Sequence, residues 1–225
     1  MHFDRLFRGV EGLGLSLPKA VTAGYLDDQI EETVAANEAL DICRVRLHVY
    51  KADDAAAFVI ACFPLDEEAI VLNKKGLVVG IADGIVKTTR KDNNLKISNS
   101  VIYSQAPVVV SQNSWDDVLI VNEAGHITES GIANIFWIKE AVIYTPPLTE
   151  GCVEGVMRRY IIETLRKENI EVFELPLTKQ LLLEAEEVFL TNAIRKIRWV
   201  ANIEGVAYEH STIDQLYELL FQGNI

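Results

Sequence analysis

The residues with the clearest chemical potential lie where polar side chains interrupt apolar sequence. Lys96 stands between Leu95 and Ile97. A lysine removed from water has a lowered pKa, so its neutral amine becomes a nucleophile. Most lysines are instead exposed to solvent, and Lys87 and Lys91 lie in the same polar stretch. This segment alone leaves a solvated lysine and a reactive amine both open.

A carboxylate, Glu129, precedes the apolar run that contains Asn134, Ile135 and Phe136. Such a carboxylate can pair with the protonated ring nitrogen of a ligand. The alternative is a turn residue whose head group stays in water. Asn134 would then be a buried structural amide.

Two segments could hold an anion through backbone N–H groups. Gly155 precedes a helical pattern, and the N-terminus of a helix attracts negative charge. Asn192 and Ala193 follow a short apolar strand pattern at residues 187–191. A plain joint between a loop and a helix explains Gly155 equally well, so neither segment is diagnostic by itself.

The composition limits the classes of protein that need consideration. The chain has 225 residues, a net charge of −12 and 49% hydrophobic residues, so it can bury a core and shows no basic patch for nucleic acid. Its three cysteines form no CxxC pair, which argues against a zinc site and fits a reducing compartment. No apolar run is long enough to span a membrane, and the N-terminus has no signal-peptide pattern. We therefore expect a cytoplasmic protein without a metal site.

The elements that must position these residues follow from periodicity. The first part of the chain shows two helical patterns and then period-two alternation. We expect helices at residues 3–13 and about 26–34, followed by strands at 42–50, 56–63, 69–73 and 77–81. The polar stretch 87–96 is the predicted linker between two domains.

The second part is expected to hold short strands and a few helices. A helix is predicted at residues 98–111, which Pro107 should kink or end. Strands are predicted at 117–121, 127–128, 133–138, 141–144, 171–174, 187–191 and 196–203, with a helix at 154–167 and a short helix after Pro176. Ser211 and Asp214 resemble a capping box at the start of a last helix.

Taken together, the polar segments resemble the motifs of fold-type IV pyridoxal-phosphate enzymes, the aminotransferase class IV superfamily. The resemblance runs from His2 to about Gly205. The matching motifs are Lys96 with Asn99, Glu129 with Asn134-Ile135-Phe136, Thr145-Pro146-Pro147-Leu148, Gly155-Val156-Met157-Arg158, and Glu187-Val188-Phe189-Leu190-Thr191-Asn192.

The resemblance implies an α+β fold of two domains with pyridoxal 5'-phosphate between them and a homodimer that binds a small amino substrate. The smaller, N-terminal domain would span residues 1–90 and the larger, barrel-like domain residues 91–225. It further implies that Lys96 forms the Schiff base and acts as the catalytic base, and that Glu129 contacts the pyridine nitrogen. The phosphate would be held by Gly155, Val156, Met157, Asn192 and Ala193.

Within the family, the phosphate-binding residues resemble those of aminodeoxychorismate lyases. These enzymes use Gly-Ile-Met-Arg and Asn-Ala-Leu, often with a cysteine just before the first motif. This chain has Cys152, then Gly155-Val156-Met157-Arg158, and later Asn192-Ala193-Ile194. The resemblance implies conversion of 4-amino-4-deoxychorismate to p-aminobenzoate and pyruvate, in the folate branch. A branched-chain or D-amino-acid aminotransferase is the alternative, although these enzymes usually have Thr where Met157 stands.

Arg46 is the candidate substrate-binding residue. It shares a predicted strand face with Arg44 and His48, opposite Val45 and Leu47, and it lies near the position of a substrate-contacting arginine in the family. A guanidinium binds a carboxylate through two parallel hydrogen bonds. A solvated strand face accounts for the same pattern, so both interpretations stay open.

Two departures from the family pattern affect these expectations. The sequence begins at the family's His-x-x-Arg-Leu motif, here His2, Arg5 and Leu6. It is therefore expected to have an incomplete N-terminal domain, to lack the upstream arginine that grips the phosphate, and to bind the cofactor more weakly. The family's tyrosine after the lysine motif is also unmatched, because Tyr103 falls too far along. These departures favour a non-catalytic descendant, whereas the intact Lys96 and Glu129 argue against one.

Overall fold

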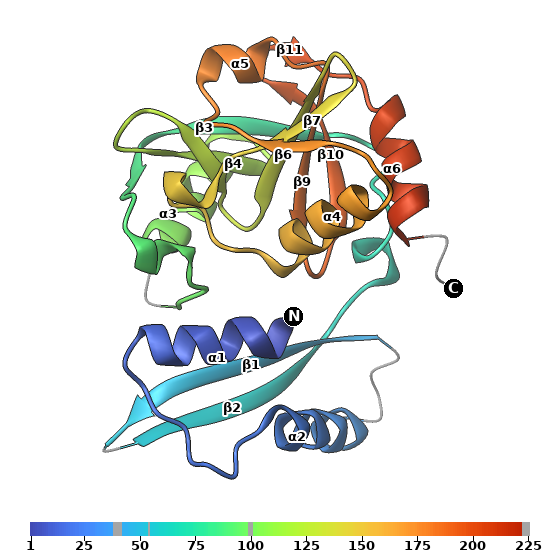
Figure 1. Cartoon of the computed structure of the whole chain (residues 1–225). Coiled ribbons are helices and arrows are strands. Elements are labelled where there is room, and N and C mark those ends of the chain that lie inside the picture. Colours follow the sequence, from blue (N-terminus) through green and yellow to red (C-terminus); the bar gives the residue numbers. More distant parts are fainter. Residues whose placement is uncertain (38–41, 54, 99–100, 222–225) are drawn as a thin grey trace. The chain divides into compact units, whose positions relative to one another are not determined.

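The computed structural model of the chain describes residues 1–37, 42–53, 55–98 and 101–221. These residues form two compact units, Met1–Ile70 and Val71–Ile225 (Figure 1). The predicted domain boundary near residue 90 thus lies inside the second unit. Within the described part of the chain, no helix combines the length and the apolar character needed to cross a membrane.

The first unit is a long β-hairpin with two helices. Its elements are α1 (His2–Gly12), α2 (Ala23–Ala35), β1 (Cys43–Ala52), β2 (Ala55–Pro64) and a single 3-10 turn at Glu67–Ala69. Thr22 caps α2 by accepting a hydrogen bond from the backbone N–H of Tyr25. Leu26 on the same helix is fully buried. The strand predicted at residues 69–73 was wrong, because Ile70 ends the 3-10 turn instead.

The second unit is built on a sheet that closes on itself. Its strands are β3 (Leu77–Lys87), β4 (Asp117–Asn122), β5 (Ile127–Ser130), β6 (Asn134–Lys139), β7 (Val142–Thr145), β8 (Val172–Glu174), β9 (Glu187–Asn192), β10 (Lys196–Ile203) and β11 (Val206–Ala207). Strands β6, β9, β10, β3, β4 and β5 pair in that order, and β5 pairs with β6 again. The six strands therefore form a closed, barrel-like sheet, which confirms the predicted fold class.

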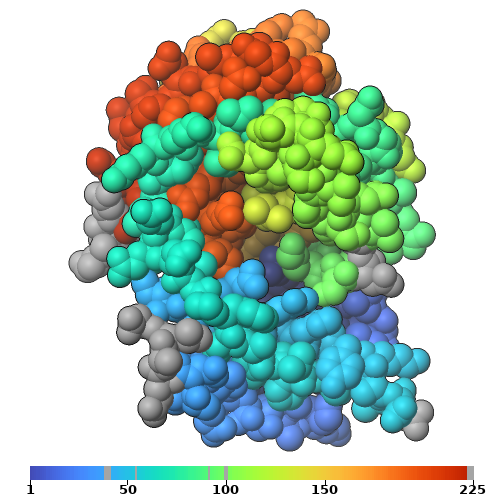
Figure 2. Space-filling model, turned by 180° about the vertical axis from the view of Figure 1, so that it is seen from behind, coloured from blue at the N-terminus to red at the C-terminus, as the bar shows by residue number. Residues whose placement is uncertain are grey.

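Strand β3 joins the two halves of this barrel. It lies parallel to both of its neighbours, β10 and β4. In Figure 2 the teal segment that contains β3 runs between the red C-terminal segments and the green segment of the larger unit. Because both neighbours of β3 are strands of the larger unit, residues 77–87 belong to that unit and not to the N-terminal one.

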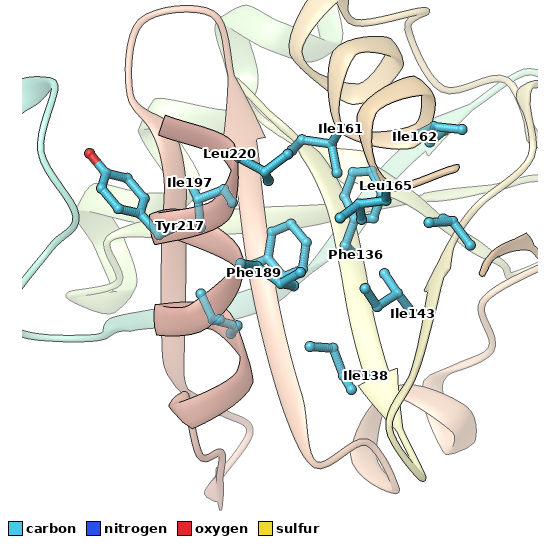
Figure 3. Packing of buried hydrophobic residues seen from close by; sticks show 13 residues of the cluster. Phe136, Ile138, Ile143, Ile161, Ile162, Leu165, Phe189, Ile197, Tyr217 and Leu220 are labelled. Carbon is cyan, nitrogen blue, oxygen red and sulfur yellow. The ribbon is translucent and has the colours of Figure 1, made fainter. Parts of the chain in front are cut away.

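Helices cover the barrel. They are α3 (Val101–Asn113), α4 (Val156–Lys167), α5 (Lys179–Leu183) and α6 (Ser211–Phe221). Helix α3 does not end at Pro107 but continues to Asn113. Figure 3 shows Ile161 and Leu165 of α4 and Leu220 of α6 near the sheet residues Phe136 and Phe189. The two phenylalanine rings stack with 4.9 Å between their centroids, and the apolar residues of both helices pack in the same core cluster.

A buried carboxylate caps the last helix. Glu187 on β9 accepts hydrogen bonds from the backbone N–H groups of Thr212 at 2.8 Å and Ile213 at 2.9 Å, and from the Ser211 hydroxyl at 3.3 Å. The first N–H groups of a helix need such partners. The predicted capping box of Ser211 and Asp214 was therefore wrong, since the acceptor comes from a strand distant in sequence.

We predict that Glu187→Ala lowers the free energy of unfolding by about 1–2 kcal/mol, as the loss of a helix cap typically does. Glu187→Gln, which keeps one acceptor oxygen, should lose less. Urea denaturation followed by circular dichroism measures both. Glu218→Ala, on an exposed part of the same helix, is the control. Equal stabilities for the Glu187→Ala and Glu218→Ala proteins would refute the cap.

Candidate functional site

Glu129 is the centre of a buried polar cluster in the larger unit. Strand β5 places it between Ile120 of β4 and Asn134 of β6, and only 3% of its surface is exposed. Its Oε2 accepts a hydrogen bond from the backbone N–H of Val153 at 2.8 Å. Its Oε1 accepts one from the Tyr103 hydroxyl at 2.5 Å. The site thus holds a carboxylate that is buried and already hydrogen-bonded on both oxygens.

Lys87, the last residue of β3, supplies the positive charge beside Glu129. Its Nζ donates to Oε1 of Glu129 and, at 2.8 Å, to the hydroxyl of Tyr103. A longer contact of 3.5 Å reaches the carbonyl oxygen of Asn93. Lys87 is also 3% exposed. A buried carboxylate is costly without such a partner, so this pair accounts for the burial of both groups.

Lys96 lies beside the same tyrosine. Its Nζ is 5.4 Å from the centroid of the Tyr103 ring, and the Nζ of Lys87 is also 5.4 Å from that centroid. The side chain of Lys96 is exposed, which is the solvated arrangement among the two that its sequence left open, and the buried lysine is Lys87. Asn99, the other member of the predicted lysine motif, lies outside the described residues.

The loop that carries Lys96 is held against the loop before α4. Asn94 donates from Nδ2 to the carbonyl oxygens of Leu148 at 2.9 Å and Cys152 at 2.6 Å. Its own carbonyl accepts the N–H of Glu154 at 2.9 Å. Gly151 has a φ of 89°, and a Cβ there would lie 2.6 Å from the carbonyl oxygen of Thr88. Both loops are thereby fixed next to Glu129.

Helix α4 begins in this cluster with an open N-terminus. Gly155 is its N-cap, and no side chain in the described part of the protein caps it. Asn134 donates from Nδ2 to the carbonyl of Val153 at 2.8 Å, and its Oδ1 occupies the place that a Cβ at Gly155 would take. The N–H groups of the first turn, which contains Val156 and Met157, form the kind of site that binds phosphate.

Asn192 organises the turn between β9 and β10. Its Oδ1 accepts the N–H groups of Ile194 at 3.0 Å and Arg195 at 2.8 Å, and its Nδ2 donates to the carbonyl of Ile132 at 3.4 Å. The phosphate contact expected mainly of the backbone at Asn192 and Ala193 stays a prediction. The side chain of Asn192 shapes the turn.

Burial sets the ionisation of two more groups here. It raises the pKa of Tyr103 above its ordinary range, and the charge of Glu129 raises it further. Burial also raises the pKa of the Cys152 thiol to about 12. Both groups are therefore neutral near pH 7, and Tyr103 acts as a hydrogen-bond donor to Glu129.

The structure separates the predicted residues into two sets. The larger unit contains all but one of them, namely Lys96, Glu129, Gly155, Val156, Met157, Asn192 and Ala193. Arg46 instead lies on β1 of the first unit, and its side chain is exposed. Sequence reasoning did not assign Tyr103 or Lys87 to the site. Lys87 did carry a signal, because it stood among the rival lysines of the same polar stretch.

We predict that Gly155→Ala lowers the free energy of unfolding by about 1–3 kcal/mol, because the added methyl group overlaps Oδ1 of Asn134. Thermal or urea denaturation of the protein alone measures this effect. Gly9→Ala, on α1, is the matched control, since a Cβ there meets no atom within 4 Å. If both variants unfold alike, the close approach of Asn134 to Gly155 is disproved.

The chain has clear relatives among known proteins. The sequence pattern described as "Amino-transferase class IV" matches residues 1–203. The aminodeoxychorismate lyase of Bacillus subtilis (strain 168) is 28% identical over 92% of this chain and 73% of that protein. The branched-chain-amino-acid aminotransferase of Escherichia coli (strain K12) is 27% identical over 66% of this chain and 49% of that protein.

Solved structures share the fold. A branched-chain aminotransferase from Thermoproteus uzoniensis, with norvaline, superposes with a TM-score of 0.84 at 23% identity and covers 99% of this chain and 79% of its own. A T.th. branched-chain amino acid aminotransferase with pyridoxamine 5'-phosphate gives a TM-score of 0.84 at 21% identity, over 98% and 77% of the two chains. The match to the family pattern covers most of the sequence, and the chain belongs to the aminotransferase class IV family.

Proposed function

We propose that this protein is a pyridoxal-phosphate-dependent lyase that converts 4-amino-4-deoxychorismate to p-aminobenzoate and pyruvate. The observation that carries the proposal is the buried carboxylate of Glu129, which lies with two lysines next to the open N-terminus of α4. A carboxylate, an amine and an anion-binding helix end are the groups that this cofactor requires.

The residues present fit pyridoxal 5'-phosphate. Glu129 would contact the ring nitrogen, and Gly155, Val156 and Met157 would hold the phosphate together with Asn192 and Ala193. When bound, the cofactor supplies an aldehyde that captures amines and a ring that accepts electrons. The related T.th. enzyme has been solved with the pyridoxamine form, which supports this choice of cofactor.

Lys87 and Lys96 would have different roles at this site. A lysine that holds the aldehyde of the cofactor would not also pair with the carboxylate that meets the ring nitrogen. Since Lys87 is hydrogen-bonded to Glu129, we propose that Lys96 holds the aldehyde. The Lys96 amine would also serve as the base that accepts the proton from the carbon bearing the substrate's amino group.

The residues around the phosphate favour a lyase over an aminotransferase. Met157 stands where branched-chain and D-amino-acid aminotransferases usually have threonine, and Asn192-Ala193-Ile194 resembles the lyase loop. The relatives carry both activities in their names. An aminotransferase is therefore the second candidate, and it would differ in returning the proton instead of expelling pyruvate.

Three further expectations go with the proposal. We propose a homodimer, as the family resemblance implies, and a cytoplasmic location, as the cysteine usage favours. We also propose that Arg46, which is exposed on β1, binds a carboxylate of the substrate. Arg46→Ala should then raise KM, whereas an unchanged KM and kcat would mean that this strand face is only solvated.

The activity assay separates the candidates. The purified protein with pyridoxal phosphate is given 4-amino-4-deoxychorismate, and p-aminobenzoate and pyruvate are measured. A second sample receives branched-chain or D-amino acids with a keto acid, and amino-group transfer is measured. Equal amounts of p-aminobenzoate and pyruvate support the lyase. Transfer without pyruvate release supports the aminotransferase, and neither reaction in a cofactor-loaded protein supports a non-catalytic descendant.

We predict that borohydride reduction of the cofactor-loaded protein labels Lys96. Reduction makes the bond between cofactor and lysine permanent, and peptide mapping by mass spectrometry locates it. Lys96→Ala should abolish the label, whereas Lys167→Ala, at an exposed lysine, should keep it. A label on Lys87 or Lys91 would show that the wrong lysine has been assigned.

We predict that Glu129→Gln lowers kcat by about a hundredfold or more, because an amide does not stabilise a protonated ring nitrogen as a carboxylate does. Bound cofactor, measured by absorbance, should be retained in part. The matched control is Glu163→Gln on the outer part of α4, which should leave kcat unchanged. A loaded Glu129→Gln protein that turns over normally would exclude this role.

A further inference from the structure

We propose that Lys87 is a positioning residue that orients Glu129 and sets how strongly the carboxylate attracts a proton to the cofactor ring. The inference rests on the proposed function in one respect, which is that Glu129 faces the ring nitrogen. It adds a residue that the family motifs do not contain. Its basis is the set of contacts that Lys87 makes at the end of β3.

Among the described residues, the contacts of Glu129 leave one acceptor position unfilled. A carboxylate has about four acceptor positions, two on each oxygen. Oε1 accepts from both Lys87 and Tyr103, so its positions are filled. Oε2 accepts from the N–H of Val153 and keeps one position. The geometry therefore points to Oε2 as the atom that meets the ring nitrogen, with Oε1 turned into the protein.

Lys87 also fixes Tyr103. The lysine donates to the tyrosine hydroxyl, and that hydroxyl donates onward to Glu129. The three side chains come from β3, α3 and β5, so each element restrains the other two. Removal of Lys87 would take a hydrogen bond from both the carboxylate of Glu129 and the hydroxyl of Tyr103. Removal of an exposed lysine would not have this effect.

The charge of Lys87 has a predictable consequence. Lys87 and Glu129 together have no net charge, so the pair attracts a proton on the ring less strongly than Glu129 would alone. Among the described residues, the other titratable groups near this pair are Tyr103, Cys152 and Lys96, and the charge of Arg158 acts on Cys152. Tyr103 and Cys152 stay neutral, which leaves Lys87 as the cation that contacts the carboxylate directly.

A spectroscopic titration tests the role. The visible absorbance of bound pyridoxal phosphate is followed against pH in the wild type, Lys87→Met, Lys87→Arg and the exposed control Lys167→Met. A nearby cation disfavours the protonated, positively charged form of the cofactor. Lys87→Met should therefore raise the apparent pKa of the transition by about one unit or more, whereas Lys87→Arg and Lys167→Met should stay close to the wild type.

A second measurement uses the protein without cofactor. Unfolding is measured for Lys87→Met, Glu129→Gln and the double variant. If the side chains form one pair, the double variant should lose less than the two single losses combined, with a coupling of about tenfold in the unfolding equilibrium constant. Additive losses would show that Lys87 does not hold Glu129 and would overturn the inference.

The outcomes separate this inference from the proposed function. A loaded wild type with an unshifted Lys87→Met titration overturns the role of Lys87 alone. A pyridoxyl label on Lys87 also overturns it, because that nitrogen would then hold the cofactor and would not pair with Glu129. If the wild type takes up no cofactor at all, the proposed function fails. The role of Lys87 toward the cofactor ring then fails too, even if the unfolding measurements show that Lys87 and Glu129 are coupled.

Discussion

The need to satisfy one buried carboxylate, that of Glu129, organises the site. A buried charge without partners costs several kcal/mol, and here every partner comes from a different element. Lys87 ends β3, Tyr103 lies on α3, and Val153 belongs to the loop before α4. The polar cluster therefore forms only when the strands, the helix and the loop have all reached their final places.

The closed sheet supplies the rigidity that this cluster requires. Strand β5 is paired on both sides, with β4 and β6, so the backbone of Glu129 cannot shift alone. Phe136 and Phe189 stack on each other and pack with apolar residues of α4 in one core cluster. The open helix end at Gly155 and the carboxylate are thus held by one core. Sites on rigid elements keep their geometry better than sites on loops.

Much of the fold could be predicted from local patterns. The strand predicted at residues 196–203 agrees with β10, and the predicted helix that ends at residue 167 agrees with α4. Both were found because apolar residues repeat along them with the period of a strand or of a helix. The domain boundary could not be placed in this way. Strand β3 belongs to the larger unit because it pairs with β10, more than a hundred residues later, and a long-range parallel pairing has no local signal. The cap from Glu187 on α6 was missed for the same reason.

The sequence by itself determined the family, the barrel-like class of fold and the set of candidate residues, because motif order and hydrophobic period are properties of the linear chain. It did not determine which lysine is buried. Lys87 and Lys96 stand nine positions apart in one polar stretch, and both reach the ring of Tyr103. Only the tertiary structure places Lys87 against Glu129 and leaves Lys96 exposed, since that choice depends on where β3 ends relative to β5. Burial of a charge is decided by the neighbours that folding brings to it, and those neighbours come from strands that lie far apart in the sequence.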